Sequence, residues 1–413
     1  MRLDKAVSVG PIKFEKLLLI VVLLELLLGG NGYLTEIYGI RLRVWLAVLC
    51  MAFVAYRLVK RPSAGVQIEI WVLFFLFLAV TGFGTIIGLL NDSRTDAILN
   101  ELKPLFYFPM LLFFAMAIRD EGNIARVTRL IVICGIAQAF AYLTVMALVH
   151  SGTIQYSTIY YTLKASDEFI FRDEGAAVYF GGFLYKGALH MCIAAIFLWF
   201  EPLWKNRILA LVLMVAIVLT FTRGLVAALI LTFAYSALLN VNRKTILALA
   251  LALIALIVFG ISIDLIGMMQ RPVSDQVRLA DLRTFLSEID LTMLLIGDGL
   301  GAEIGQRERI EMTYVEILYK QGLIGLLFWL GLFLFNLGLY RRIKNAALRQ
   351  QAFVFHLATF FVYVTTASNT FLTGSIGMAV VLISTVILMV LNKLDAGQSG
   401  RGVTARVPLR TSQ

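Results

Sequence analysis

The stretch "ILALVLMVAIVLTFTRGLVAALILTFAYSALL" (residues 208–239) is uncharged except for one residue, Arg223. As a single α-helix it would be about 48 Å long, because an α-helix rises about 1.5 Å per residue. The hydrocarbon core of a bilayer is only about 30 Å thick. We therefore expect the chain to turn at Arg223 and Gly224, which gives two short membrane helices with Arg223 at the tip of their hairpin.

The whole chain has the composition of a polytopic membrane protein. Of its 413 residues, 60% are hydrophobic and 15% are charged, and the mean hydropathy is +0.87. Its long apolar stretches are continuous rather than alternating, which favours helices over a β-barrel. We predict an all-α polytopic membrane protein with about twelve transmembrane helices and two large periplasmic loops, one of which contains interfacial helices. The expected spans lie near residues 16–33, 44–60, 69–90, 103–119, 127–149, 179–200, 207–222, 224–240, 245–263, 313–339, 351–368 and 374–392.

Basic residues cluster in alternate connections between these spans, and the positive-inside rule makes those connections and both termini cytoplasmic. We expect one transmembrane domain over residues 1–392, whose first helix is an uncleaved membrane span. Its large periplasmic loops lie near residues 150–178 and 264–312. Residues 393–413 are expected to form a disordered basic cytoplasmic tail. The internal basic clusters are Arg57/Lys60/Arg61, Arg119/Arg126/Arg129, Lys205/Arg207, Arg243/Lys244 and Arg341/Arg342/Lys344/Arg349.

The remaining composition excludes some classes of function. The net charge of +10 is explained by topology, so no nucleic-acid partner is expected. Cys50, Cys134 and Cys192 lie in apolar segments at unrelated spacings, which indicates packing residues rather than a zinc site or disulfides. The sequence contains no cluster with metal-ligand spacing, so we expect neither a metal nor a cofactor.

Three arginines are expected on the outer face: Arg223, and Arg278 and Arg283 in the longest loop. Arg223 has almost no loop around it, so its guanidinium is expected to face the protein interior, where it suits a phosphate. The segment "RLADLRTFLSEI" (residues 278–289) predicts an interfacial helix in which Arg278 lies within the apolar stripe and Arg283 flanks it. Alternatively, Arg278 extends to lipid headgroups. The stripe consists of Leu279, Leu282, Phe285, Leu286 and Ile289.

The following segment, "LLIGDGLGAEIG" (residues 294–305), alternates Gly297, Gly299 and Gly301. By itself this pattern is weak, because it lacks the preceding strand of a nucleotide fingerprint and can be a flexible turn. It leads into "IEMTYVEILYKQGLIGLLFWLGLF" (residues 310–333), a membrane helix with Glu311 and Glu316 near its outer entrance.

The order of these features resembles the O-antigen ligase and polymerase superfamily of bacterial envelope glycosyltransferases. The resemblance is densest from Val218 to Leu327, from the "TRG" of the hairpin to "YVEILYKQGLIGLL". Members of that family take a glycan from an undecaprenyl diphosphate carrier on the periplasmic side and join it to a sugar hydroxyl. The resemblance implies a bacterial inner-membrane protein whose partners are an undecaprenyl-diphosphate-linked oligosaccharide donor, a sugar acceptor, the lipid bilayer and, as candidates, other polysaccharide-assembly membrane proteins.

The resemblance also assigns roles to individual residues. Arg223 matches the arginine of the family's "SRG"-like motif and Arg278 matches its loop arginine, so both are expected to contact the diphosphate in place of a metal ion. Ligases of the family commonly carry a His-Asn pair where this chain has Glu311 and Met312, which weakens the ligase assignment. Glu311 remains a candidate base or acceptor anchor, or else an ion-pair partner of a nearby arginine.

Other candidates for substrate contact lie in and after the first large loop. His150, Tyr160, Tyr161 and Arg172 combine hydroxyl, aromatic and charged groups that suit a sugar chain, although an aromatic belt predicts similar tyrosines. Lys186 is expected one helical turn from His190 in the next span, as a third diphosphate contact. Arg283 completes this group of candidates.

The resemblance implies an enzyme, a membrane glycosyltransferase that polymerises lipid-linked units at the periplasmic face without a metal. A ligase that transfers the finished glycan to another acceptor is a close alternative. A lipid-oligosaccharide flippase or transporter is the alternative from another class, since about twelve spans suit it equally well.

Overall fold

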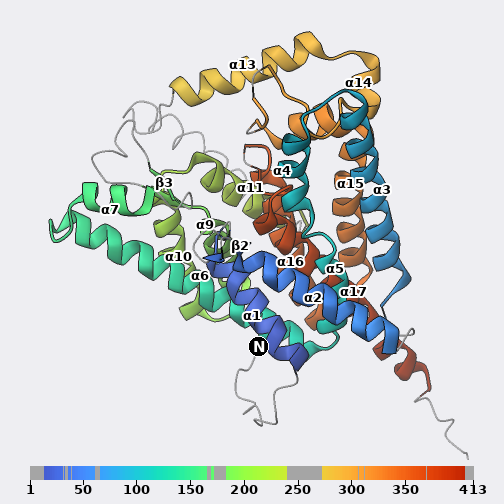
Figure 1. The fold of residues 1–413 in the computed structure, drawn as a ribbon. Helices are drawn as coiled ribbons and strands as arrows, with labels where there is room; N and C mark the ends of the chain where they lie inside the picture. The colour runs from blue at the N-terminus through green and yellow to red at the C-terminus, as the bar shows by residue number, and fades with distance from the viewer. Residues whose placement is uncertain are drawn as a thin grey trace, which may run out of the picture.

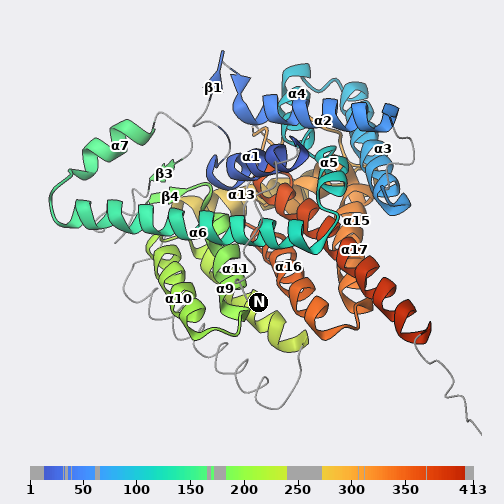
Figure 2. The ribbon, with the colours of Figure 1, turned by 90° about the horizontal axis from the view of Figure 1, so that it is seen from below.

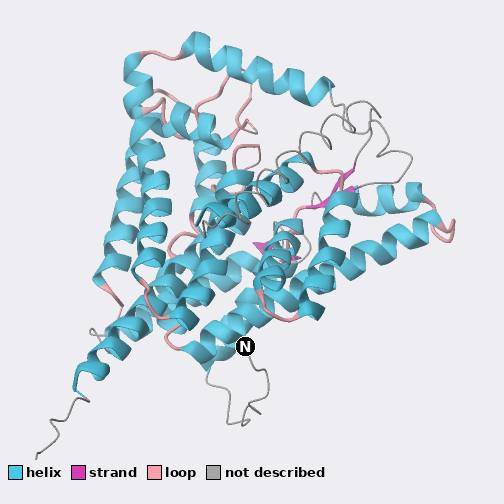
Figure 3. Ribbon diagram, turned by 180° about the vertical axis from the view of Figure 1, so that it is seen from behind, coloured by secondary structure: helices cyan, strands magenta, loops and turns pink. Residues whose placement is uncertain are grey.

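The structure is a computed structural model in which helices predominate (Figure 3). It describes residues 14–30, 32, 36–38, 40–60, 66–164, 169–171, 183–239, 272–305, 307–310, 312–368 and 370–404. In the first half of the chain the elements are α1 (Phe14–Leu28), β1 (Glu36–Ile37), β2 (Ile40–Arg41), α2 (Leu42–Lys60), α3 (Ile68–Leu90), α4 (Thr95–Leu105), α5 (Met110–Ala117), α6 (Glu121–His150), α7 (Tyr156–Lys164), β3 (Phe169–Phe171), β4 (Phe183–Tyr185) and α9 (Ala188–Phe200). In the second half they are α10 (Trp204–Leu219), α11 (Arg223–Leu239), α13 (Pro272–Glu288), α14 (Leu291–Ile296), α15 (Thr313–Arg342), α16 (Ala346–Thr365) and α17 (Ser375–Thr404).

The helix α13 lies across one end of the molecule, and the long helices α3 and α15 run side by side away from that end (Figure 1). Seen from below, α6 crosses the molecule, with α1 on one side and α9 and α10 on the other (Figure 2). The strands form two short antiparallel hairpins, β1–β2 and β3–β4. The buried side chains of the helices form one continuous apolar core, and a smaller cluster lies beneath α13.

Six of the described helical segments are long and apolar enough to cross a membrane. They establish a helical membrane protein with several spans, while the predicted number of about twelve is not confirmed. The expected span near 245–263 lies outside the described residues. The six segments are Leu42–Lys60, Ile68–Leu90, Thr95–Ala117, Glu121–His150, Thr313–Arg342 and Ser375–Gln398.

Two predicted spans are arranged differently in the structure. The span near 103–119 combines the end of α4 with α5, because the chain turns over residues 106–109, which end at Pro109. The span near 179–200 is helical only from Ala188, since Phe183–Tyr185 instead pairs with Phe169–Phe171 as a β-hairpin. Aromatic contacts join the two strands, including Phe169 with Tyr185 at 5.2 Å between ring centroids.

The hairpin predicted from the apolar stretch 208–239 is confirmed, because α10 ends at Leu219 and α11 begins at Arg223. The turn lies slightly earlier than predicted: Phe221 takes the left-handed conformation (φ 52°), whereas Gly224 is already helical. Side chains satisfy the last carbonyls of α10. The Thr220 hydroxyl donates to the carbonyl of Ile217 at 2.7 Å, and the Tyr142 hydroxyl donates to that of Leu219 at 2.7 Å.

The C-terminal segment departs from the prediction of a disordered tail from residue 393. Helix α17 continues to Thr404. Asp395 in this extension accepts hydrogen bonds from the backbone N–H groups of Lys344 and Asn345, at 3.0 and 2.9 Å. This contact with the start of α16 explains why the helix continues past the apolar stretch.

The predicted packing role of the three cysteines is confirmed, since all three are buried and free. Among the histidines, His356 is also buried. Its Nε2 lies 2.8 Å from the Tyr235 hydroxyl, and its ring stacks on Tyr340. His356 therefore has a structural role.

A buried arginine closes the end of α1. Arg43 is only 2% exposed, and its Nε donates to the carboxylate of Glu25 at 2.9 Å. Its other nitrogens donate to the Ser375 hydroxyl at 2.6 Å and to the Gly30 carbonyl at 2.6 Å. One guanidinium thus joins α1, α2 and α17 and satisfies a carbonyl beyond the end of α1.

Replacing Arg43 by methionine should destabilise the fold, because the carboxylate of Glu25 stays buried without its partner. We expect a loss of roughly 3–5 kcal/mol in the free energy of unfolding. Reversible unfolding in mixed micelles measures it. The control is Arg57→Met, which breaks the more exposed pair with Glu15 and should cost at most about 1 kcal/mol. Equal losses in the two variants would contradict the assignment.

Candidate functional site

The alternating glycines form a tightly packed loop between α3 and α15. Gly297, Gly299 and Gly301 all have positive φ angles of 80°, 95° and 84°, which glycine adopts readily. A Cβ added to Gly299 would lie 2.0 Å from the backbone nitrogen of Gly88, and one added to Gly297 would lie 2.5 Å from the backbone of Lys320. The pattern therefore serves close backbone approach, and we name residues 297–301 the glycine loop.

The backbone N–H groups of the glycine loop are all used within the protein. Asp298 and Gly299 donate to the carbonyls of Tyr319 and Lys320, at 2.7 and 3.0 Å. Gly297 and Leu300 donate to the carbonyls of Met293 and Gly84, each at 2.8 Å. Gly301 donates to the carboxylate of Glu101 at 3.1 Å. These donors are consequently engaged, and the loop is not arranged as a phosphate cradle.

The glycine loop packs against α15 where this helix is interrupted. Gly322 interrupts the helix with non-helical angles (φ 62°, ψ −164°). The carbonyls of Tyr319 and Lys320 then accept from the glycine loop. A Cβ on Gly322 would lie 2.4 Å from the carbonyl oxygen of Leu295, so glycine is required here as well.

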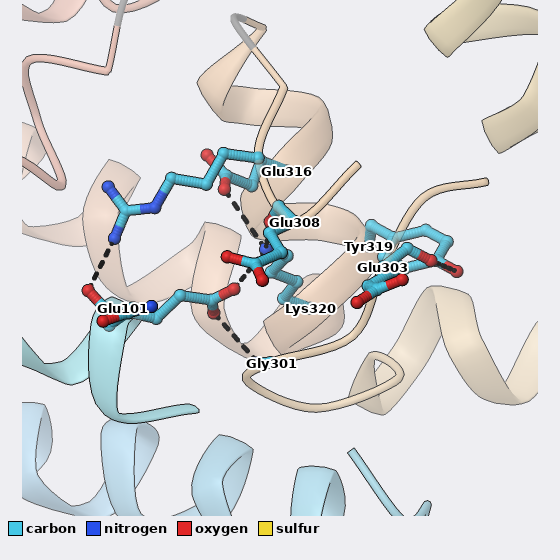
Figure 4. A network of polar contacts seen from close by, with 9 residues as sticks. Glu101, Gly301, Glu303, Glu308, Glu316, Tyr319 and Lys320 are labelled. Atoms are coloured by element: carbon cyan, nitrogen blue, oxygen red, sulfur yellow. Dashed lines mark hydrogen bonds and ion pairs between the residues drawn. The ribbon is translucent and has the colours of Figure 1, made fainter. Parts of the chain in front are cut away.

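Beside the loop, a buried ammonium joins two carboxylates (Figure 4). Lys320 is 2% exposed; its Nζ donates to Glu101 and to the backbone carbonyl of Glu308, and lies 3.3 Å from Oε1 of Glu316. Glu101 also accepts from the Gly301 N–H. Because both carboxylates are buried, we refer to Glu101, Glu316 and Lys320 as the acidic cluster.

The acidic cluster lines a small open pocket of about 30 Å³. This volume has room for a hydroxyl group or about one or two water molecules. Arg309 lies at the pocket and donates to the carbonyl of Asn100 at 2.9 Å. The other lining residues are Pro104, Leu105, Leu300, Ile317, Gln321 and Thr373.

Further charges surround the acidic cluster. Arg94 pairs with Asp96 at 2.5 Å, and contacts Glu308 at 3.4 Å and Glu303 at 3.5 Å. Burial raises the pKa of the Asp298 carboxyl, and the charges of Glu288 and Asp290 raise it further. The hydrogen bond that Asn91 donates to this carboxyl acts in the opposite direction, but it does not outweigh burial.

The predicted helix in the outer loop is confirmed as α13, but its apolar stripe is only partly buried. Phe285 is buried, whereas Leu279 and Leu286 are 47% and 62% exposed. The buried face also includes Asp281, which binds Arg307 at 2.7 Å. Arg278 is half-buried on this face, three residues before Asp281.

The other predicted site residues come from separate parts of the fold. Arg283 is exposed on α13, and half-buried Arg223 is the first residue of α11. Lys186 lies in the turn before α9, so the prediction that it shares a helix face with His190 was wrong. The physical reason is the β3–β4 pairing, which holds the chain extended up to Tyr185.

The aromatic candidates gather on one side of the molecule, toward the beginning of α13 (Figures 1 and 3). His150 ends α6, and Tyr160 on α7 packs against Tyr161 and Phe171, with ring centroids 5.4 and 4.9 Å away. Tyr161 is 77% exposed. The candidates Arg172 and Glu311 lie outside the described residues.

The structure brings together charges that the sequence did not single out as site residues. Glu101 and Lys320 are 219 residues apart in the chain. A sequence signal for half of the cluster did exist, because Glu316 and Lys320 are four residues apart on one helix face. No sequence signal pointed to Glu101, because an acidic residue near the end of an amphipathic helix is expected to be exposed.

The fold and its buried charges define a multi-span helical membrane protein with a polar site at one end. No family model matches the chain. It is 29% identical over 325 residues to an O-antigen polymerase of Shigella flexneri, an alignment that covers 75% of this chain and 79% of that protein. This similarity supports membership of the O-antigen polymerase and ligase family.

The packing of the glycine loop predicts that Gly299→Ala destabilises the protein. The cost should exceed the roughly 1–3 kcal/mol of a strained backbone conformation, because the new Cβ also meets the backbone of Gly88. Gly331→Ala in α15 is the control, since a Cβ there meets nothing within 4 Å. Thermal unfolding of both purified variants in detergent measures the difference. A Gly299→Ala protein that melts like the wild type would refute the packing role.

Proposed function

We propose that this protein polymerises oligosaccharide units carried on undecaprenyl diphosphate into a surface polysaccharide. The reaction takes place at the periplasmic face of the bacterial inner membrane, with both termini in the cytoplasm, by glycosyl transfer that needs no metal. The observation that carries the proposal is the similarity to an O-antigen polymerase over three quarters of the chain. The six apolar membrane-crossing segments agree with a lipid-linked substrate.

In this proposal Arg223 receives the carrier diphosphate. It begins α11, and the carbonyl of Thr222 accepts the first backbone hydrogen bonds of that helix, from Leu225 and Val226. The N-terminal end of a helix favours anions, and a guanidinium there adds a permanent charge with a planar set of donors. Both effects stabilise the negative charge that develops on the leaving diphosphate.

The other predicted residues complete the proposed site. Arg278 supplies a second guanidinium from the buried face of α13, and Lys186 a third cation before α9. Tyr160 and Tyr161, with His150, Arg172 and Arg283, contact the sugars. Glu311 anchors the acceptor hydroxyl.

Replacing Arg223 tests this function in cells that lack the native copy. We expect Arg223→Ala to lower chain extension by about 10²–10³-fold, the usual cost of removing one charge-stabilising donor. Single lipid-linked repeat units should then accumulate outside. Arg223→Lys should recover little, because an ammonium lacks the bidentate geometry. Analysis of surface glycan and lipid-linked intermediates gives the readout.

The matched control is Arg207→Ala. Arg207 is exposed near the start of α10, at the end of that helix away from Arg223, and its replacement should leave the glycan unchanged. Wild-type glycan from both Arg223 variants would contradict the catalytic role. Long lipid-linked chains would indicate a ligase instead, and units retained on the inner leaflet would indicate a flippase.

A further inference from the structure

The acidic cluster has the arrangement of a proton-accepting site. We propose that Glu316 is a catalytic residue that removes the proton from the acceptor sugar hydroxyl, with Lys320 and Glu101 as its positioning residues. This inference rests on the proposed function and adds a specific base to it. It is carried by three features of the described structure: the distribution of hydrogen bonds in the cluster, its net charge, and the pocket that it lines.

The hydrogen bonds distinguish the two carboxylates. Glu101 accepts from Lys320 and also from the backbone N–H of Gly301, so it is held from two directions. Glu316 has a longer contact of 3.3 Å with the same ammonium, through Oε1. Glu101 is thus fixed as the main counter-ion of Lys320, which leaves Glu316 the less compensated of the two acids.

The charges of the cluster do not cancel. Two carboxylates and one ammonium carry a net charge of −1 if all are ionised, and all three side chains are at least nine-tenths buried. Burying charged groups is costly, so ionisable groups inside membrane segments are functional candidates. The charged and polar side chains that line the pocket with Glu316 are Lys320 and Gln321 on its own helix, Glu101 on α4, and Arg309 and Thr373 from connecting segments.

The pocket can receive a hydroxyl group. Glu316 lines it together with Arg309, and the pocket is open to the surface. A sugar lying over the opening could direct a single hydroxyl inside, within reach of the carboxylate. Apolar side chains of the lining, such as Leu300 and Ile317, exclude other water from this hydroxyl.

The reaction step balances with these groups alone. The hydroxyl proton passes to the Glu316 carboxylate, while the hydroxyl oxygen forms a bond to the anomeric carbon of the donor sugar. The bond from that carbon to the diphosphate oxygen breaks, and its electron pair leaves with undecaprenyl diphosphate. Glu316 then returns the proton to water at the pocket opening. Lys320 holds the carboxylate in place throughout.

The experiment measures chain extension by the purified full-length protein in lipid nanodiscs, with a lipid-linked repeat unit as donor and acceptor. Rates are recorded against pH and substrate concentration. We expect Glu316→Gln to lower kcat by about 10²–10⁴-fold with little change in KM. Glu316→Asp should recover part of the rate. Glu303→Gln, a carboxylate outside the pocket, is the matched control and should behave as wild type.

A second variant separates proton transfer from structure. Glu101→Gln removes the other negative charge, so the Lys320 charge favours ionised Glu316 and the acidic limb of the pH–rate profile should move toward lower pH. If the cluster had only a structural role, Glu101→Gln would change the thermal stability of the protein without moving this limb. If Glu316→Gln does not fold, the acidic limbs of the pH–rate profiles of Glu101→Gln and Glu316→Asp still test the proposal.

The outcomes distinguish this inference from the proposed function. If the wild type extends chains and folded Glu316→Gln keeps its kcat and acidic limb, the inference is wrong while the polymerase function stands. An unmoved limb in both Glu101→Gln and Glu316→Asp also overturns it. If the wild type itself extends no chains under conditions in which it remains folded, the proposed function and the inference fail together.

Discussion

Inside a membrane protein, a backbone group that leaves a helix must find a partner in the protein, and this constraint accounts for the irregular parts of the fold. Beyond the end of α1, Arg43 donates to a free carbonyl. At the end of α10, the Tyr142 hydroxyl does the same. The glycine loop satisfies the carbonyls that the break at Gly322 releases from α15. Polar groups thus gather where helices end or break, and the candidate site lies at the break in α15.

Helix length and charge predicted the parts of the fold that depend on local sequence. The hairpin of α10 and α11 follows from the length of one apolar stretch, and α13 follows from its periodicity. The exact turn was missed because Phe221, rather than a glycine, adopts the left-handed conformation. The β-hairpin before α9 was missed because strand pairing joins residues whose apolar composition equally suits a helix.

The site was harder to predict because its members meet only in three dimensions. Alternating glycines signalled a special backbone, but the sequence could not tell a phosphate-binding turn from a loop packed between helices. The distinction depends on the acceptors of the loop N–H groups, which α3, α4, α14 and α15 supply. Arg43 is a similar case: it was not singled out from the sequence, whereas in the structure it is buried and binds Glu25 and Ser375.

The same contacts connect the outer helix to the acidic cluster. Tyr319 and Lys320 are consecutive, and the Tyr319 hydroxyl lies 3.1 Å from the carboxylate of Glu288 at the end of α13. The neighbouring Lys320 holds Glu101 and Glu316. Both backbone carbonyls accept from the glycine loop, so none of these parts can shift alone without breaking hydrogen bonds. Because α13 also carries Arg278, an anion bound there would be held in fixed relation to Glu316, as a transfer from a diphosphate to a sugar hydroxyl requires.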